Sequence, residues 1–202
     1  MKILITNDDG IESPLIHTLY KKLLSLGHEC IICAPDKNNS CVSSSLRFWE
    51  YKYNDITKIC DNIYTHKGTP ADGINYYLRH FGLNPDLIIS GINNGYNAGF
   101  DVLYSGTIGA ASEGIVHSIP SIALSANEDA TSNTIDKALD IILAKVFSQK
   151  LYSNSFVYSF NIPSKLVSKN IAITSLNMKK DSKNFNSFEP SVSNLEIFQY
   201  DS

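Results

Sequence analysis

The stretch MKILITNDDG (residues 1–10) decides the fold class. Residues 2–6 form a β-favouring apolar run that leads straight into an asparagine, two adjacent aspartates and a glycine. Ser13-Pro14 then indicates a helix start, because serine caps helices and proline fits their first turn. Residues 29–34 form a second, continuously apolar run. A strand, a helix and a strand in this order predict a βαβ unit with two parallel strands.

The same alternation continues along the chain and predicts a three-layer α/β fold, with a mostly parallel sheet and helices on both faces. We assign residues 1–177 to this domain. Residues 178–202 are polar with scattered aromatics, which predicts an extended arm or hairpin that either contacts a partner subunit or is partly disordered. We expect helices at 14–26, 70–80, 107–117 and 132–149, strands at 86–90, 120–125, 156–161 and 171–175, and an antiparallel pair formed by 47–53 and 56–65.

Composition narrows the class of protein. The chain has 202 residues, 43% of them apolar and 18% charged, and a net charge of −3. This balance disfavours a surface for a nucleic-acid polymer, and it disfavours a basic membrane anchor. No run approaches the roughly 18 apolar residues of a membrane span, and the N-terminus has no signal-peptide pattern, so we expect a cytoplasmic protein. A phosphorylated ligand would need a local binding device, because the overall charge repels it.

Cys30 and Cys33 form a C-x-x-C pair, which is typical of some redox and metal sites. They lie in an apolar run that predicts a buried strand. Residues three apart on a strand point to opposite faces, so we interpret both cysteines as small buried hydrophobic residues.

Polar side chains follow several of the predicted strands at their carboxyl ends. The clusters are residues 7–10, 36–40, 93–97 and 105–107. In an open parallel sheet ligands bind beyond the carboxyl ends of the strands, so we expect these clusters to meet at one edge.

Adjacent aspartates suggest a divalent cation at this edge. Two close carboxylates repel each other, and a cation such as Mg²⁺ or Mn²⁺ removes that repulsion. Asp8, Asp9, Ser40 and Asn93 offer the carboxylate, hydroxyl and amide oxygens that these cations prefer. The ordinary alternative is that the aspartates only favour the positive end of a helix.

Ser105-Gly106-Thr107 opens a helix rich in small residues. Hydroxyls and free N–H groups at a helix N-terminus can cradle phosphate, and the ordinary alternative is a simple helix cap. The chain has neither a P-loop motif nor a G-x-G-x-x-G after its first strand.

The order of several motifs resembles the SurE family of survival-protein nucleotidases. The similar segments cover roughly residues 1–126, with a weaker continuation through SFNIP, and read ILITNDDGIESP, APDKNNS with a serine-rich stretch after it, KGTPADG, SGINNGYNAG and YSGTIGAASEG. The resemblance implies a Rossmann-like core and a metal-dependent phosphatase for nucleoside 5′- and 3′-monophosphates, in some members also for short polyphosphate. It further implies a homodimer or homotetramer.

By motif position, the resemblance places the ligands of one divalent ion per subunit at Asp8, Asp9, Ser40 and Asn93. Asp8 and Asp9 then also carry the catalysis. Asn97 and Ser105-Gly106-Thr107 correspond to the segments that contact phosphate.

There are two departures from the family pattern: Cys41 stands beside the predicted metal-binding serine, where glycine or alanine is usual, and the chain is shorter than is usual for the family. A non-catalytic nucleotide- or phosphate-binding module is therefore the alternative function.

Overall fold

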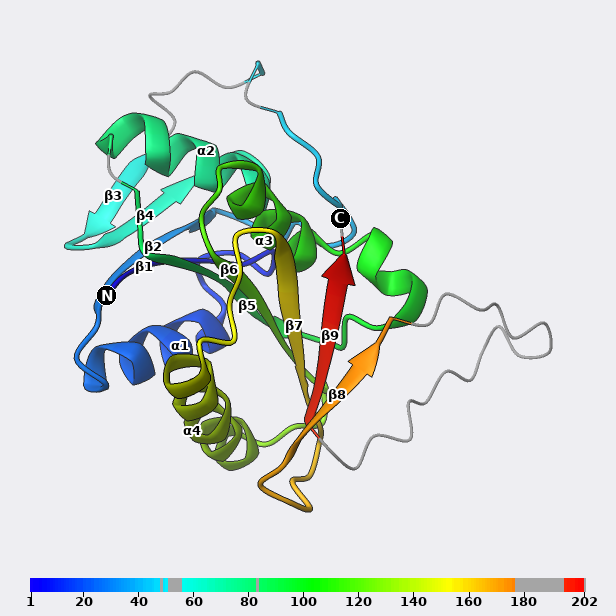
Figure 1. Ribbon diagram of the computed structural model, residues 1–202. Coiled ribbons are helices and arrows are strands. Elements are labelled where there is room, and N and C mark those ends of the chain that lie inside the picture. Colours follow the sequence, from blue (N-terminus) through cyan, green and yellow to red (C-terminus); the bar gives the residue numbers. More distant parts are fainter. Residues whose placement is uncertain (48, 51–55, 83, 177–194, 202) are drawn as a thin grey trace.

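The computed structural model describes residues 1–202 except 48, 51–55, 83, 177–194 and 202. The described strands form one sheet in the order β3-β4-β2-β1-β5-β6-β7-β9-β8 (Figure 1). The elements are β1 (Lys2–Thr6), α1 (Pro14–Ser25), β2 (Glu29–Pro35), β3 (Thr57–Cys60), β4 (Ile63–His66), α2 (Pro70–Phe81), β5 (Leu87–Asn94), the 3₁₀ helix η2 (Gly99–Leu103), α3 (Gly106–Val116), β6 (Ser121–Ala126), α4 (Ser132–Gln149), β7 (Phe156–Ile162), β8 (Ile171–Ser175) and β9 (Leu195–Asp201).

The centre of the sheet is parallel, as the sequence predicts. β4, β2, β1, β5, β6 and β7 run in one direction, and antiparallel pairs occur where β3 meets β4 and where β9 meets β7. The chain leaves β1 toward β2 on one side, and β5 later pairs with β1 on the other side. The boundary between β1 and β5 is therefore a topological switch point, and α/β sheets bind their ligands beyond the carboxyl ends of the strands at such points.

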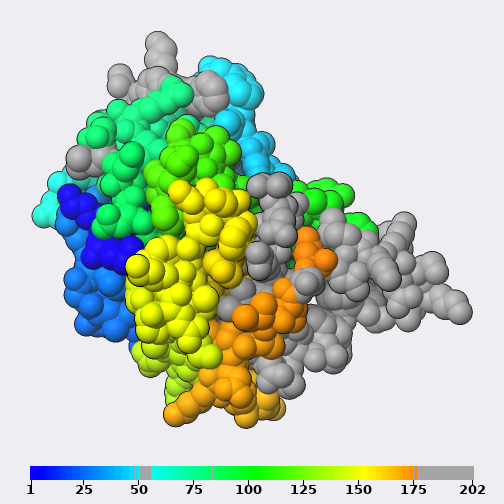
Figure 2. Space-filling view, in the orientation of Figure 1, coloured from blue at the N-terminus to red at the C-terminus, as the bar shows by residue number. Residues whose placement is uncertain are grey.

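Helices cover both faces of the sheet. Alternate side chains of β1 explain this, because Ile3 and Ile5 pack in the apolar cluster with α1 and α4, whereas Leu4 packs in the cluster with α2. Figure 1 shows the resulting three layers, with α1 and α4 on one face and α2 and α3 on the other. Figure 2 shows the surface in the same orientation, with blue atoms of the N-terminal part of the chain on the left and orange atoms from the region of β8 toward the lower right.

Local signals explain where the helices begin. α1 has Pro14 in its first turn, and Gly27 beyond its end adopts φ +82°. α2 starts with a capping box, in which the Thr69 side chain accepts from the Asp72 N–H and the Asp72 side chain accepts from the Thr69 N–H. The predicted bounds of α4 and β8 agree with the structure, and the other helices and parallel strands differ by a few residues at their ends.

The prediction for residues 47–65 is wrong in its pairing. The segment 56–65 does not form one long strand, because it folds into the β3–β4 hairpin. Asn62 turns the chain there with φ +63°, a conformation that asparagine tolerates better than most residues. The predicted partner, 47–53, lies partly outside the described residues, and its described members form no strand.

The C-x-x-C interpretation is confirmed. Cys30 belongs to the apolar cluster on the α1 and α4 face, and Cys33 belongs to the cluster on the α2 face. Burial raises the pKa of Cys30 to about 11 and that of Cys33 to about 12, so both thiols stay protonated at neutral pH.

Part of the predicted C-terminal arm joins the sheet. β9 lies between β7 and β8, antiparallel to β7 and parallel to β8. Residues 178–194 of the arm fall outside the described residues, so its role in subunit contacts stays a prediction. Within the described part of the chain, every helix is too short or insufficiently apolar to span a lipid bilayer.

Candidate active site

The turn after β1 presents the two aspartates at the switch point. Its ends are closed by Asn7, whose side-chain nitrogen donates to the Gly10 carbonyl at 2.9 Å and whose side-chain oxygen accepts from the Gly10 N–H at 3.2 Å. Gly10 has φ +96°, and a Cβ at this position would lie 2.9 Å from the Lys37 carbonyl carbon. The turn therefore packs directly on the loop after β2, and it places Asp8 and Asp9 just beyond the carboxyl end of β1.

The first turn of α3 holds the Asp8 carboxylate. The Thr107 hydroxyl donates to Asp8 Oδ1 at 2.6 Å, and the Thr107 N–H donates to Asp8 Oδ2 at 3.1 Å. Asp8 is 3% exposed and Thr107 is fully buried. Gly106 permits this approach, because a Cβ there would lie 2.9 Å from Asp8 Cβ. The positive end of the helix dipole also favours a carboxylate at this place.

The two carboxylates are costly to ionise together. Burial raises the pKa of Asp8, the neighbouring Asp9 charge raises it further, and the Thr107 hydroxyl opposes this shift. Burial also raises the pKa of Asp9, against a hydrogen bond from the Asn94 N–H at 3.1 Å. Among the described residues, neither carboxylate forms an ion pair with a lysine, arginine or histidine.

Ser40 and Asn93 come from two further chain segments that contact the aspartates, besides the first turn of α3. The loop with Ser40 is fixed by the Asn39 N–H, which donates to the Asp8 carbonyl oxygen at 2.6 Å. Asn93 ends β5 next to Asn94, the residue that binds Asp9. The Asn93 side-chain nitrogen donates to the Gly95 carbonyl at 2.8 Å, so the remaining polar atom of this amide is an oxygen.

The donor set suits a hard divalent cation. Asp8, Asp9, Ser40 and Asn93 together offer two carboxylates, a hydroxyl and an amide oxygen, and a cation would relieve the repulsion between the carboxylates. Within the described residues, no group of three or more His, Cys, Asp or Glu side chains is arranged to hold a metal. The four predicted ligands offer oxygen atoms only, with no thiolate or imidazole, and such a set fits Mg²⁺ or Mn²⁺ better than zinc.

The other predicted site residues lie farther along the same edge. Ser105 caps α3 by accepting from the Ile108 N–H at 3.1 Å. Asn97 is 4% exposed, and its side-chain nitrogen donates to Ser125 Oγ at 2.8 Å. Asn161 binds the Asn97 backbone on both sides, accepting from its N–H at 3.0 Å and donating to its carbonyl at 3.1 Å. In this structure Asn97 is thus joined to β6 and β7.

Sequence reasoning missed two residues that position the site, and it placed a third, Asn39, in the 36–40 cluster without giving it a role. Ser125 and Asn161 near the ends of β6 and β7 hold Asn97, and Asn39 holds the backbone of Asp8. The rule that used strand ends to find the clusters could have found Ser125 and Asn161 as well, because both lie toward the same edge of the sheet.

Two carboxylates, several amides and a helix N-terminus thus lie at the switch point of a parallel sheet, the place where α/β proteins of this class have their ligand sites. The chain belongs to the SurE family, because the family profile described as "Survival protein SurE" matches residues 3–183.

Curated relatives agree with this assignment. The chain is 38% identical over 167 residues to a "5'-nucleotidase SurE" of Albidiferax ferrireducens, covering 81% of this chain and 65% of the relative. It is 46% identical over 127 residues to one of Vibrio cholerae, covering 62% of this chain and 50% of the relative. A "5'-nucleotidase SurE" of Leptospira interrogans is 40% identical over 187 residues, covering 87% of this chain and 71% of the relative. The chain thus spans between one half and about seven tenths of the length of these three relatives.

A solved structure supports the same fold over the whole chain. The SurE protein from Aquifex aeolicus has a TM-score of 0.84 and 30% sequence identity, and the match covers 100% of this chain and 93% of that one. The predicted α/β fold is therefore confirmed.

Proposed function

We propose that this protein is a phosphatase that hydrolyses nucleoside 5′-monophosphates with the help of one divalent cation, Mg²⁺ or Mn²⁺. The observation that carries the proposal is the pair formed by buried Asp8 and half-buried Asp9, whose pKa values are both raised by loss of solvent, at the switch point of a SurE-family sheet. The activity named for relatives at 38–46% identity supports the choice of substrate. An anion-binding module would gain nothing from two carboxylates at this place without a cation.

Asp8, Asp9, Ser40 and Asn93 would hold the cation. When bound, it would supply Lewis acidity and neutralise charge on the phosphate. Both carboxylate oxygens of Asp8 accept hydrogen bonds from Thr107, so the main role of Asp8 would be to bind and orient the cation. Asp9 is the less buried of the two and accepts only one described hydrogen bond, from Asn94, so it is the better candidate to accept a proton from the attacking water.

The N-terminus of α3 and Asn97 would bind the phosphate. The Thr107 N–H already donates to Asp8, and the Ile108 N–H already donates to the Ser105 hydroxyl. Phosphate oxygens would therefore be bound at this turn by the Gly106 N–H and by the positive end of the helix dipole. Donors fixed in advance stabilise the charge that develops on these oxygens during hydrolysis. We extend the proposal to nucleoside 3′-monophosphates and short polyphosphate as substrates, and to a homodimer or homotetramer as the assembly.

The direct test is phosphate release from a panel of nucleoside monophosphates and polyphosphate, with Mg²⁺, Mn²⁺ or EDTA. We expect release from the 5′-monophosphates with metal and none with EDTA. Asp9→Asn should lower the turnover at least ~100-fold, which corresponds to about 2.7 kcal/mol in the activation free energy. Asp61→Asn is the matched control, because Asp61 is an exposed carboxylate in the β3–β4 turn.

Two outcomes would reject the proposal. Turnover near the wild-type value in Asp9→Asn would remove Asp9 from the catalytic machinery. Nucleotide binding without phosphate release under any metal condition would favour the non-catalytic binding module.

A further inference from the structure

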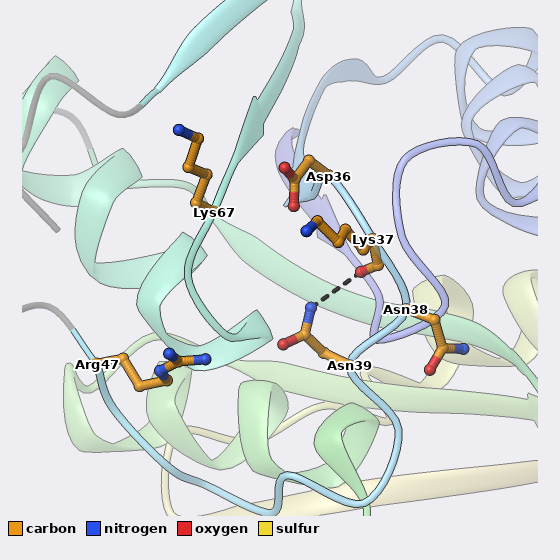
Figure 3. A pocket seen from close by; sticks show the side chains of 6 residues that line it. All are labelled: Asp36, Lys37, Asn38, Asn39, Arg47 and Lys67. Atoms are coloured by element: carbon orange, nitrogen blue, oxygen red, sulfur yellow. Dashed lines mark hydrogen bonds between the residues drawn. The ribbon is translucent and has the colours of Figure 1, made fainter. Parts of the chain in front are cut away.

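A second polar site is formed in part by the loop that follows β2, the same loop that contacts the backbone of Asp8. It is a cavity of about 380 Å³ lined by Asp36, Lys37, Asn38, Asn39, Arg47 and Lys67. Figure 3 shows these side chains around one space, contributed by the loop after β2, the segment at Arg47 and the turn between β4 and α2. Asn39 joins the two sites, because its side chain lines the cavity and its N–H binds the Asp8 carbonyl oxygen.

The cavity is cationic in a protein of net charge −3. It gathers three basic side chains and one carboxylate. Arg47 pairs with Glu50 at 2.6 Å, but Lys37 and Lys67 form no ion pair within the described residues. This concentration of positive charge is the local device that an anionic ligand needs to overcome the overall charge of the chain.

The backbone around the cavity is fixed by hydrogen bonds. The Lys37 carbonyl accepts from the Asn39 side chain at 2.9 Å, and the Asp36 N–H donates to the His66 carbonyl at 2.8 Å, which ties the loop to the residue before Lys67. The Arg47 N–H donates to both carboxylate oxygens of Asp72 in α2, at 2.9 and 3.0 Å. The segments that carry the three cations are therefore positioned before any ligand arrives, which favours binding of a compact anion.

We propose that this cavity binds the second phosphoryl group of substrates that carry two or more, while the first lies at the Asp8–Asp9 edge. The inference rests on the proposed phosphatase function and deepens it. A nucleoside monophosphate has no group to place in the cavity, so Lys37 and Lys67 would distinguish substrates by their number of phosphoryl groups. Nucleoside 3′,5′-bisphosphates and short inorganic polyphosphates share this chemistry.

The test compares adenosine 5′-monophosphate, adenosine 3′,5′-bisphosphate and inorganic tripolyphosphate as substrates of Lys37→Gln and Lys67→Gln. Each variant should raise the KM for the bisphosphate at least about tenfold, the scale of one lost charge-assisted hydrogen bond, and leave the KM for the monophosphate within about twofold. Lys137→Gln is the control, because Lys137 is an exposed lysine on α4. Equal effects on the bisphosphate and on tripolyphosphate would support a site for the second phosphoryl group of either substrate. An effect on only one of them would show that the site binds that substrate alone.

An equal rise in the KM for the monophosphate, or no change for either multiply phosphorylated substrate, would overturn the inference. Calorimetric binding of the same ligands in the presence of Mg²⁺ separates this inference from the proposed function. If the protein releases no phosphate from any substrate, the hydrolase proposal fails. The cavity assignment then stands only if the bisphosphate binds more tightly than the monophosphate and Lys67→Gln removes the difference.

Discussion

Replacing Thr107 with valine tests whether this residue holds Asp8. The change keeps the shape of the side chain and removes the hydroxyl that lies 2.6 Å from Asp8 Oδ1. Both partners are buried, and a hydrogen bond to a charged group contributes about 1.5–3 kcal/mol. The Thr107 N–H bond at 3.1 Å remains. We therefore expect Thr107→Val to lower the free energy of unfolding by about 1.5–3 kcal/mol, or the Tm by roughly 3–12 °C for a chain of this size.

The assay is urea unfolding at pH 7 in EDTA, so that no bound cation contributes. Thr107→Ser is the matched control, because it keeps the hydroxyl and loses only a methyl group, which costs about 1 kcal/mol or less. A double-mutant cycle with Asp8→Asn isolates the interaction. In the Asp8→Asn background the acceptor is neutral, so the cost of Thr107→Val should fall by at least about 1 kcal/mol.

The reasoning fails if valine and serine at position 107 give the same free energy of unfolding, or if Thr107→Val and Asp8→Asn are additive. Either result would mean that Asp8 does not depend on the Thr107 hydroxyl. Thr107 would then be free for the phosphate contact that the family resemblance implies.

Three further predictions concern the same edge of the sheet. Burial raises the pKa of Asp9, so the folded protein binds the Asp9 proton more tightly than the unfolded chain does. The stability that this proton contributes is present below the unfolded pKa near 3.8 and is lost as the pH rises through the higher folded pKa. Asp9→Asn should therefore raise the Tm in EDTA at pH 7, and this gain should disappear in melts below pH 3.8. Asn93→Ala should increase the Mg²⁺ or Mn²⁺ concentration needed for half-maximal phosphate release, and an unchanged titration would remove Asn93 from the proposed ligands. Gly109→Ala would place a Cβ 2.3 Å from the Ser43 carbonyl oxygen and displace the loop that carries Ser40. It should therefore also increase the metal concentration needed for half-maximal phosphate release, although it touches none of the four proposed ligands. An unchanged titration would show that the position of this loop does not affect metal binding.

Much of the fold follows from local patterns in the sequence. Continuous apolar strands separated by amphipathic helices predict a parallel sheet, and Pro14, Thr69 and Gly27 mark helix ends by their own conformational preferences. The β3–β4 hairpin was harder to predict, because its strands are only four residues each and β3 is fully exposed. β3 carries no buried apolar face, so alternation gives no signal for its register.

The site was predictable only as a set of clusters. Strand ends placed Asp8, Asn93 and Ser105 at one edge, and the structure places them there. The partner of each side chain was not predictable, because it depends on contacts between distant segments: Thr107 and Asp8 are 99 residues apart, and Asn97 and Asn161 are 64 apart. Sequence spacing predicts neighbours on one helix or strand, whereas the sheet order decides which loops meet.

The distribution of charge around the loop after β2 explains why the two proposed sites belong together. Lys37 and Lys67 line the cavity, yet neither forms an ion pair with Asp8 or Asp9. If these lysines neutralised the aspartates, the pKa values of the carboxyls would be lowered, but both are raised. The carboxylates and the lysines therefore do not neutralise each other, which is what the proposed cation and the proposed phosphoryl ligand require. A phosphorylated substrate bound together with a divalent cation satisfies both requirements at once.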